Sequence, residues 1–174
     1  IDGDLTNSGT IANSGTITVS NTGGDGISNT VGAITNNLGG TITVSSSGIG
    51  TGLINSGTIN NLGGTIAILI EGSIDNSNIF SNSGTITISN SIGTLYAINN
   101  GATFSNSGTI TISNTSGDGM DNSSGTFTNS GTITIQNSGT STGIYNDSTF
   151  TNSGIITVSN TGGSSKGIEN VGGG

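Results

Sequence analysis

Short alternating phrases of apolar and polar residues fill the chain, and the same three phrases recur about every 23 residues. Two of the phrases place an apolar residue two positions before an asparagine. The third reads Thr-Ile-Thr-Ile-x-Asn, as in Thr109 to Asn114. A period of two within each phrase predicts a β-strand with one buried and one exposed face, and the Ser-Gly pairs between phrases predict turns.

The apolar residues that lead the phrases define three columns. The first column contains Leu5, Ile27, Leu53, Ile74, Ile98, Met120, Ile144 and Ile168, the second Ile11, Ile34, Ile59, Phe80, Phe104, Phe127 and Phe150, and the third Ile17, Ile42, Ile66, Ile86, Ile110, Ile133 and Ile156. Strands this short do not fold alone. We therefore predict an all-β fold in which residues 1–174 form a single parallel β-helix (β-solenoid) of about seven coils, each with three short strands and about 20–26 residues.

Asparagine ends each phrase, and stacked coils would place these side chains above one another. The first set is Asn7, Asn29, Asn55, Asn76, Asn100, Asn122, Asn146 and Asn170, and the second is Asn13, Asn36, Asn61, Asn82, Asn106, Asn129 and Asn152. A third set, Asn21, Asn90, Asn114, Asn137 and Asn160, is interrupted by Ser46 and Ile70. Because Asn tolerates the backbone of sharp corners and carries both a donor and an acceptor, we predict inward-facing structural Asn ladders.

Composition and charge limit the kinds of functional site that the chain can form. The chain contains no Cys, His, Pro or Trp, and Lys166 is its only basic residue against nine acidic residues, for a net charge of −8. This excludes thiolate nucleophiles, zinc–sulfur sites and histidine bases. Phosphate backbones and anionic membranes attract basic proteins, and no apolar run approaches the ~20 residues of a membrane-spanning helix. We expect no nucleic acid partner, no membrane insertion, no cofactor and no metal.

The carboxylates do not predict an active site. Asp75, Asp121 and Glu169 share one outward position two coils apart, roughly 10 Å from the usual strand spacing, whereas glycoside hydrolysis uses pairs about 5–9.5 Å apart. We therefore expect no enzyme. Calcium binding in the equivalent Asp25 and Asp118 loops stays open, although nonapeptide calcium repeats carry aspartate in every turn and these coils do not. Glycosylation sequons at Asn114, Asn122 and Asn146 conflict with their inward assignment.

The run from Asn13 to Asn21, which closes at residues 26–29, reads Asn-Ser-Gly-Thr-Ile-Thr-Val-Ser-Asn, and similar runs begin at Asn106, Asn129 and Asn152. This sequence pattern resembles the passenger repeats of bacterial autotransporters and related secreted adhesins. The resemblance implies a right-handed β-helix exported to the cell surface. We therefore expect a non-enzymatic extracellular structural protein, a filament, stalk or adhesin, with cell-surface or matrix ligands as further partners.

Two features leave the assembly and a second function open. The repeat starts in mid-pattern and stops inside an eighth copy, so we expect a segment of a longer repeat protein or a unit that stacks end to end as a homopolymer. The third phrase also predicts an outward ladder that resembles the ice-binding faces of β-solenoid antifreeze proteins: Thr16, Thr18, Thr41, Thr43, Thr85, Thr87, Thr109, Thr111, Thr132 and Thr134. Ala67 and Ile155 interrupt it, and Thr is in any case well suited to an exposed β surface.

Overall fold

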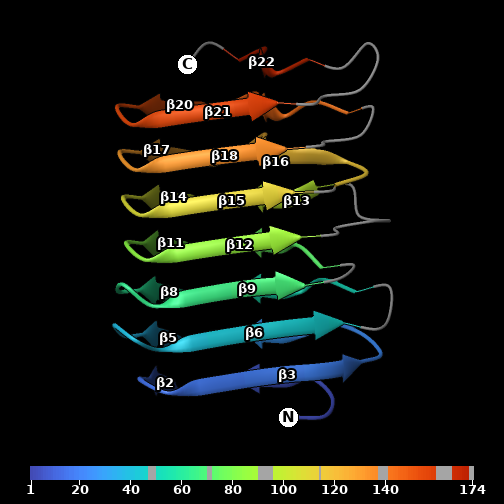
Figure 1. The fold of residues 1–174 in the computed structure, drawn as a ribbon, viewed down its shortest axis with the longest axis vertical. Coiled ribbons are helices and arrows are strands. Elements are labelled where there is room, and N and C mark those ends of the chain that lie inside the picture. The colour runs from blue at the N-terminus through green and yellow to red at the C-terminus, as the bar shows by residue number, and fades with distance from the viewer. Residues whose placement is uncertain are drawn as a thin grey trace.

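The chain winds into a rod of stacked coils in which every described element is a β-strand (Figure 1). The structure is a computed structural model that describes residues 1–46, 50–69, 72–89, 96–113, 115–136, 141–159 and 166–172, apart from the side chains of residues 21, 22 and 46. The strands facing the viewer run from left to right as the chain rises from its N-terminus to its C-terminus, so the coil is right-handed (Figure 1).

Each coil contributes one strand to each of three parallel sheets. Sheet I contains β1 (Leu5–Asn7), β4 (Ile27–Asn29), β7 (Leu53–Asn55), β10 (Ile74–Asn76), β13 (Tyr96–Asn100), β16 (Asp118–Asn122), β19 (Ile144–Asn146) and β22 (Ile168–Asn170). Sheet II contains β2 (Thr10–Asn13), β5 (Ala33–Asn36), β8 (Thr58–Asn61), β11 (Ile79–Asn82), β14 (Thr103–Asn106), β17 (Thr126–Asn129) and β20 (Thr149–Asn152). Sheet III contains β3 (Thr16–Thr22), β6 (Thr41–Ser46), β9 (Thr65–Leu69), β12 (Thr85–Ser89), β15 (Thr109–Ser113), β18 (Thr132–Gln136) and β21 (Ile155–Ser159).

The register between coils aligns residues of the same type. Phe80 is paired with Phe104, Ile86 with Ile110, and Asn82 with Asn106, all in parallel strands. This alignment follows from the repeat, because a shift of one residue would turn every buried side chain of a strand outward. The predicted parallel β-solenoid with three strands per coil is therefore confirmed.

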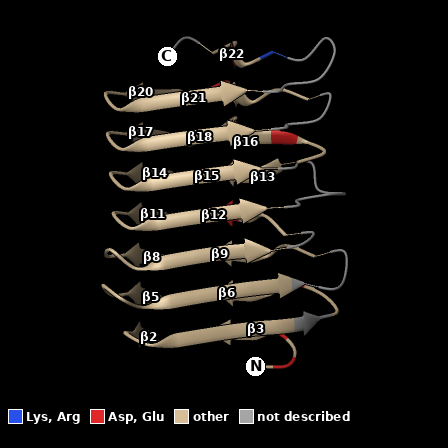
Figure 2. Ribbon diagram, in the orientation of Figure 1, with Lys and Arg blue, Asp and Glu red and all other residues tan. Residues whose placement is uncertain are grey.

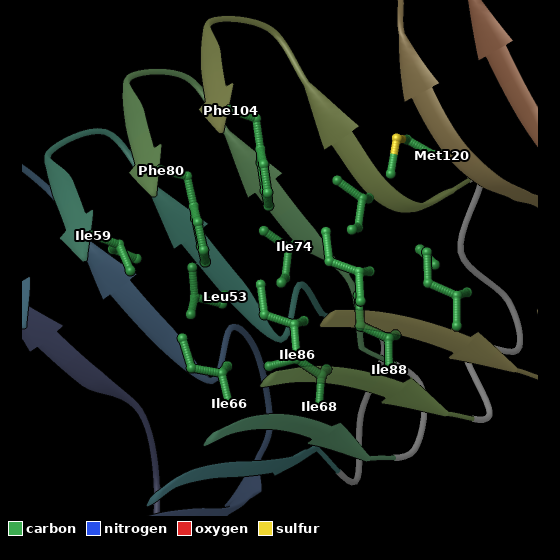
Figure 3. Packing of buried hydrophobic residues seen from close by; sticks show 14 of the residues in the cluster. Leu53, Ile59, Ile66, Ile68, Ile74, Phe80, Ile86, Ile88, Phe104 and Met120 are labelled. Carbon is green, nitrogen blue, oxygen red and sulfur yellow. The ribbon is translucent and has the colours of Figure 1, made fainter. Parts of the chain in front are cut away.

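The core is a set of apolar columns that run along the rod axis (Figure 3). Ile, Leu, Val, Met and Phe side chains of the inner coils are fully or almost fully buried. Phe80, Phe104, Phe127 and Phe150 stack face to face, with ring centroids 4.6, 4.8 and 5.1 Å apart. These distances are close to the usual spacing of about 4.8 Å between hydrogen-bonded strands, so the backbone sets the stacking.

Glycine at the corner between sheets II and III allows adjacent coils to approach closely. A Cβ atom added to Gly131 would stand 2.0 Å from the carbonyl oxygen of Gly108, and one added to Gly108 would stand 2.1 Å from that of Gly84. No side chain fits at such a distance from backbone. The Ser-Gly pairs of the repeat therefore provide turn residues whose missing side chains let the coils stack.

Candidate interaction surfaces

Both predicted Asn ladders form, and both lie inside the solenoid. In the first ladder, from Asn7 to Asn170, each side-chain amide nitrogen donates to the Oδ1 of the next Asn at 2.6–2.9 Å. In the second, from Asn13 to Asn152, the corresponding distances are 2.7–2.9 Å. All members are buried except Asn152 and Asn170 in the last described coil. The inward assignment of Asn106 and Asn129 is confirmed.

The ladders are also directional, which the sequence analysis did not predict. Between consecutive members, Nδ2 always donates toward the C-terminal end of the rod, and most of these amides also donate to a carbonyl oxygen of their own corner and to one of the next coil. Asn29, for example, donates to Gly32 O at 3.1 Å and to Thr58 O at 3.2 Å, besides Asn55 Oδ1. One amide therefore satisfies corner backbone in two coils.

The third predicted ladder falls outside the described part of the structure. The side chain of Asn21 and the whole of Asn90, Asn114, Asn137 and Asn160 lie outside the described residues. Of the three glycosylation sequons, Asn114 belongs to this group, whereas Asn122 and Asn146 are buried ladder members. A glycan on either of these two side chains would displace a ladder amide.

The predicted Thr strip occupies the outer face of sheet III. Two files run along the axis in register: Thr16, Thr41, Thr65, Thr85, Thr109 and Thr132 form one, and Thr18, Thr43, Thr87, Thr111, Thr134 and Thr157 form the other. Thr65 and Thr157 extend the set predicted from sequence. Ala67 interrupts the second file and Ile155 follows the last Thr of the first, as predicted. The strip is thus continuous over most of the sheet.

Sheet II carries a comparable hydroxyl-rich surface. Its outer positions include Ser81, Ser105 and Thr128, aligned in consecutive coils. At its edge, Ser83, Ser107 and Ser130 each donate a hydroxyl to a carbonyl oxygen of the preceding coil. These two rows line a shallow groove of about 160 Å³, and Leu62 also contributes to its lining. The repeat pattern alone did not predict this groove.

Among the described residues, charged side chains are concentrated in sheet I and in the segments beside it (Figure 2). No strand of sheet II or sheet III contains a charged residue. The charged residues with a described position lie in sheet I, in the connections that flank it, or before β1: Asp2, Asp4, Asp25, Asp75, Asp118, Asp121, Asp147, Lys166 and Glu169. The pattern is readable in the sequence, since each of them lies in or beside the first phrase of a coil.

Two equivalent aspartates, Asp25 in the connection before β4 and Asp118 at the start of β16, bind the next coil. Asp25 Oδ1 accepts the backbone N–H of Thr51 at 3.0 Å, and Asp118 Oδ1 accepts that of Thr142 at 2.7 Å. These are the two loops in which calcium binding stayed open. Among the described residues, no group of three His, Cys, Asp or Glu side chains is arranged to hold a metal ion. The two equivalent aspartates therefore have a structural role in joining consecutive coils.

A file of polar residues runs along the outer face of sheet I. Asp75, Asn99, Asp121, Tyr145 and Glu169 are aligned in consecutive coils, so the acidic residues are two coils apart, as predicted. Asn99 Nδ2 donates to Asp75 Oδ1 at 3.1 Å. Burial raises the pKa of Asp75 above its usual value, and the Asn99 hydrogen bond opposes this shift. Asp121, by contrast, is only 6% exposed.

No family model, curated protein or solved structure matches this chain. Across the described residues, no helix has the length and hydrophobicity needed to cross a membrane.

Proposed function

We propose that this chain is a non-enzymatic structural protein, a β-solenoid segment that works outside the cell or at its surface as a filament, stalk or adhesin. The observation that supports this most directly is the pair of one-directional Asn ladders. Each coil completes the hydrogen bonds of the coil before it, so extension of the rod satisfies buried polar groups. A fold of this kind is suited to a long rod with a regular surface.

The hydrogen bonds of the acidic residues support a structural role. Asp25 and Asp118 each accept a backbone N–H of the following coil, and Asp75 accepts the Asn99 amide. These carboxylates bond to neighbouring coils on the outside of the rod. Such bonds stabilise stacking, whereas acid–base catalysis requires carboxyl groups directed at a substrate.

An extracellular location rests on the resemblance of the repeats to secreted passenger domains. The broad uncharged faces of sheets II and III suit contact with cell-surface or matrix ligands, because little desolvation of charge would oppose binding. Limited proteolysis of intact cells that express the full gene tests the location. Loss of an epitope in this segment without lysis supports it, and complete protection overturns it.

The two ends of the described rod match each other over sheets I and II, whereas residues 1–3 pair with the N-terminal edge of β3. At the C-terminal end, an open recess of about 240 Å³ is lined by Ile144, Asn146, Phe150, Asn152, Ile156, Ile168 and Asn170. At the N-terminal end, Leu5, Ile11 and Ile17 are only partly buried. The ladders leave amide donors at one end and amide acceptors at the other. This match serves a following coil of the same chain as well as a second copy, and for the 174-residue chain alone we propose end-to-end self-association.

Electron microscopy and sedimentation velocity over a wide concentration range test the self-association. We expect filaments or oligomers that grow with concentration. Ile168→Asp places a charge in the C-terminal recess and should prevent growth. Val171→Asp is the matched control, since Val171 is exposed in the same coil but does not line the recess. A stable monomer at all concentrations would overturn end-to-end assembly and leave the chain as part of a longer stalk.

Ice binding is the second candidate, supported by the two Thr files of sheet III. Their side chains repeat at the strand spacing of about 4.8 Å along the axis, and no strand of the sheet contains a charged residue. Thermal hysteresis of the purified chain tests this function. Thr109→Tyr should abolish it, whereas Thr126→Tyr on sheet II should retain it. Absence of hysteresis in the unmodified chain would remove this candidate.

A further inference from the structure

Asn100, a member of the first Asn ladder, is the only asparagine of the chain that is followed by glycine. It ends β13, and Gly101 begins the corner after that strand. An asparagine before glycine is prone to deamidation, in which the backbone nitrogen of the next residue attacks the side-chain amide. Glycine permits the attack because it has no side chain to obstruct it and its backbone is flexible. One ladder member therefore has a reactive neighbour.

The packing of the corner does not require glycine at position 101. A Cβ atom added to Gly101 would meet Asn76 O at 3.6 Å and Ser124 Oγ at 3.7 Å, which is ordinary van der Waals contact. Ser77 occupies the matching position in the preceding coil, where its N–H donates to Asn55 O at 2.9 Å. The Gly101 N–H donates in the same way to Asn76 O, at 2.8 Å. Serine therefore fits this corner, and close approach of the coils does not account for the glycine.

The reaction needs only the chain itself and water. The Gly101 nitrogen loses its proton and forms a bond to Cγ of Asn100, while the bond between Cγ and Nδ2 breaks and the amide group leaves with a proton as ammonia. Water then opens the cyclic imide at one of its two carbonyl groups. The product is aspartate or isoaspartate at position 100.

The folded solenoid holds both reacting groups in other interactions. The Gly101 N–H is bonded to Asn76 O. The Asn100 side chain is fully buried, and its Nδ2 donates at 2.8–3.3 Å to oxygens of its own corner and of the next coil. Its Oδ1 accepts from Asn76 Nδ2 at 2.9 Å. The attack therefore requires this part of the rod to open, as does the access of water to Cγ.

The product does not fit the ladder. A carboxylate at position 100 still accepts from Asn76, but it has no hydrogen to donate to Asn122 Oδ1 or to the carbonyl oxygens of Ala102 and Thr126. Its charge would face these oxygens at a position with 0% exposure, and burial of a charge without sufficient donors is strongly unfavourable. Isoaspartate in addition lengthens the main chain by a carbon atom at the corner, which disturbs the alignment of the coils.

We propose that Asn100 is a deamidation site that the folded solenoid protects, and that its modification makes unfolding irreversible. A rod that opens at β13 and closes quickly keeps the amide. A rod that stays open loses the amide and cannot rebuild the ladder at this strand. Because β13 lies between β10 and β16 in the middle of sheet I, the loss separates the two halves of the first ladder.

Peptide mapping by mass spectrometry tests the protection on the 174-residue chain. One sample is kept folded and another in denaturant, at the same mildly alkaline pH and the same temperature. In denaturant we expect Asn100 to be the first asparagine converted to the acid. In the folded sample its conversion should be slower by at least about a hundredfold, because only the open fraction reacts. Equal rates in the two samples, or earlier conversion of another asparagine in denaturant, would overturn the proposal.

Gly101→Ser is the decisive variant, since serine fits the corner and its side chain obstructs the attack. We expect an unchanged melting temperature and a conversion of Asn100 in denaturant that is several-fold slower. Ser77→Gly is the matched control, because it places glycine after Asn76 in the preceding coil. In denaturant Asn76 should then react as fast as Asn100. An unchanged rate in Gly101→Ser would overturn the assignment of the reaction to this pair.

Refolding after timed exposure to denaturant tests the irreversibility. The fraction of chains that regain the native circular dichroism should fall in step with conversion at Asn100, and it should fall more slowly in Gly101→Ser. Asn100→Asp reproduces one product directly and should lower the melting temperature or prevent folding. Asn152→Asp, at the exposed end of the other ladder, should still fold. Complete refolding of the deamidated chain, or a native melting temperature for Asn100→Asp, would overturn the irreversibility. Conversion is measured from peptide masses and does not depend on filament formation.

Discussion

The side-chain nitrogen of Asn106 lies 2.7 Å from Oδ1 of Asn129, and both residues are buried between sheets II and III. Asn106 Oδ1 accepts in turn from Asn82 at 2.7 Å. One amide thus joins three coils. Asn106 Nδ2 also donates to the carbonyl oxygens of Gly108 and Thr132. The ladder therefore supports the corner backbone as well as its own members.

Asn106→Ala should therefore destabilise the solenoid strongly. The substitution leaves the Asn82 amide without its acceptor and Asn129 Oδ1 without its donor, and each stranded buried group costs about 1–3 kcal/mol. Asn152→Ala removes the same kind of side chain from an exposed end of the ladder, where water can replace it. Chemical denaturation should show a loss for Asn106→Ala several times that for Asn152→Ala. Equal losses would show that the ladder position has no special role.

Gly131→Ala tests the close approach of coils at the corner. The new Cβ would stand 2.0 Å from Gly108 O, so the backbone of one coil must shift. Overpacking of this kind costs about 1–3 kcal/mol or more. Gly15→Ala is the control, because nothing lies within 4 Å of the Cβ position at this equivalent site in the first coil. Thermal unfolding should separate the two variants, and an unchanged melting temperature for Gly131→Ala would contradict the described packing.

The Phe stack should tolerate a change of residue type better than a loss of volume. Ile34 and Ile59 occupy in earlier coils the position that Phe104 occupies in its own. Phe104→Ile should cost less than Phe104→Ala, for which about 3–5 kcal/mol is typical of a fully buried Phe. Denaturant unfolding gives both values. Similar losses in the two variants would indicate that ring stacking, rather than filled volume, stabilises this column.

Periodicity made the fold predictable before the structure was known. Because each coil repeats the sequence pattern of the preceding coil, the alignment of Phe127 with Phe104 follows from spacing alone. The inward position of Asn129 follows from its fixed offset to Phe127, which must be buried. When a local pattern repeats at a fixed spacing, equivalent residues of consecutive coils are aligned. The pattern therefore determines contacts between segments that are distant in the sequence.

Features that depend on the details of the corner backbone or on the surroundings of one residue were not predictable in this way. The direction of the ladder depends on the corner backbone, which offers carbonyl oxygens to each Nδ2 and an N–H to Oδ1, as Gly57 does to Asn55. The burial of Asp121 depends on its surroundings in the folded chain, since alternation along β16 alone assigns it to the solvent. The sequence leaves calcium binding open beside Asp25 and Asp118, whereas the buried oxygen without a partner belongs to Asp121.

Acidity should stabilise the folded chain. Burial raises the folded-state pKa of Asp75 and of Asp118 above the ordinary value of 3.8, and the nearby charges of Asp25 and of Asp121 and Glu169 add to these two shifts respectively. Within the window between 3.8 and the raised values, the folded state binds protons that the unfolded chain has already lost. Stability therefore falls as pH rises through this window and is regained as pH falls back through it.

Calorimetry from about pH 7 to about pH 4, with a chelator present to remove bound cations, tests this expectation. The melting temperature should rise on acidification. In the usual case it falls, because protonation removes the interactions of paired carboxylates. Asp75→Asn should make the rise shallower, because the amide keeps an acceptor for Asn99 but no longer titrates. Asp147→Asn, with the same change of net charge at an exposed residue, should change it less. A melting temperature that falls steadily as the pH is lowered would show that other carboxylates dominate, and it would contradict the assignment of the effect to the half-buried Asp75 and Asp118.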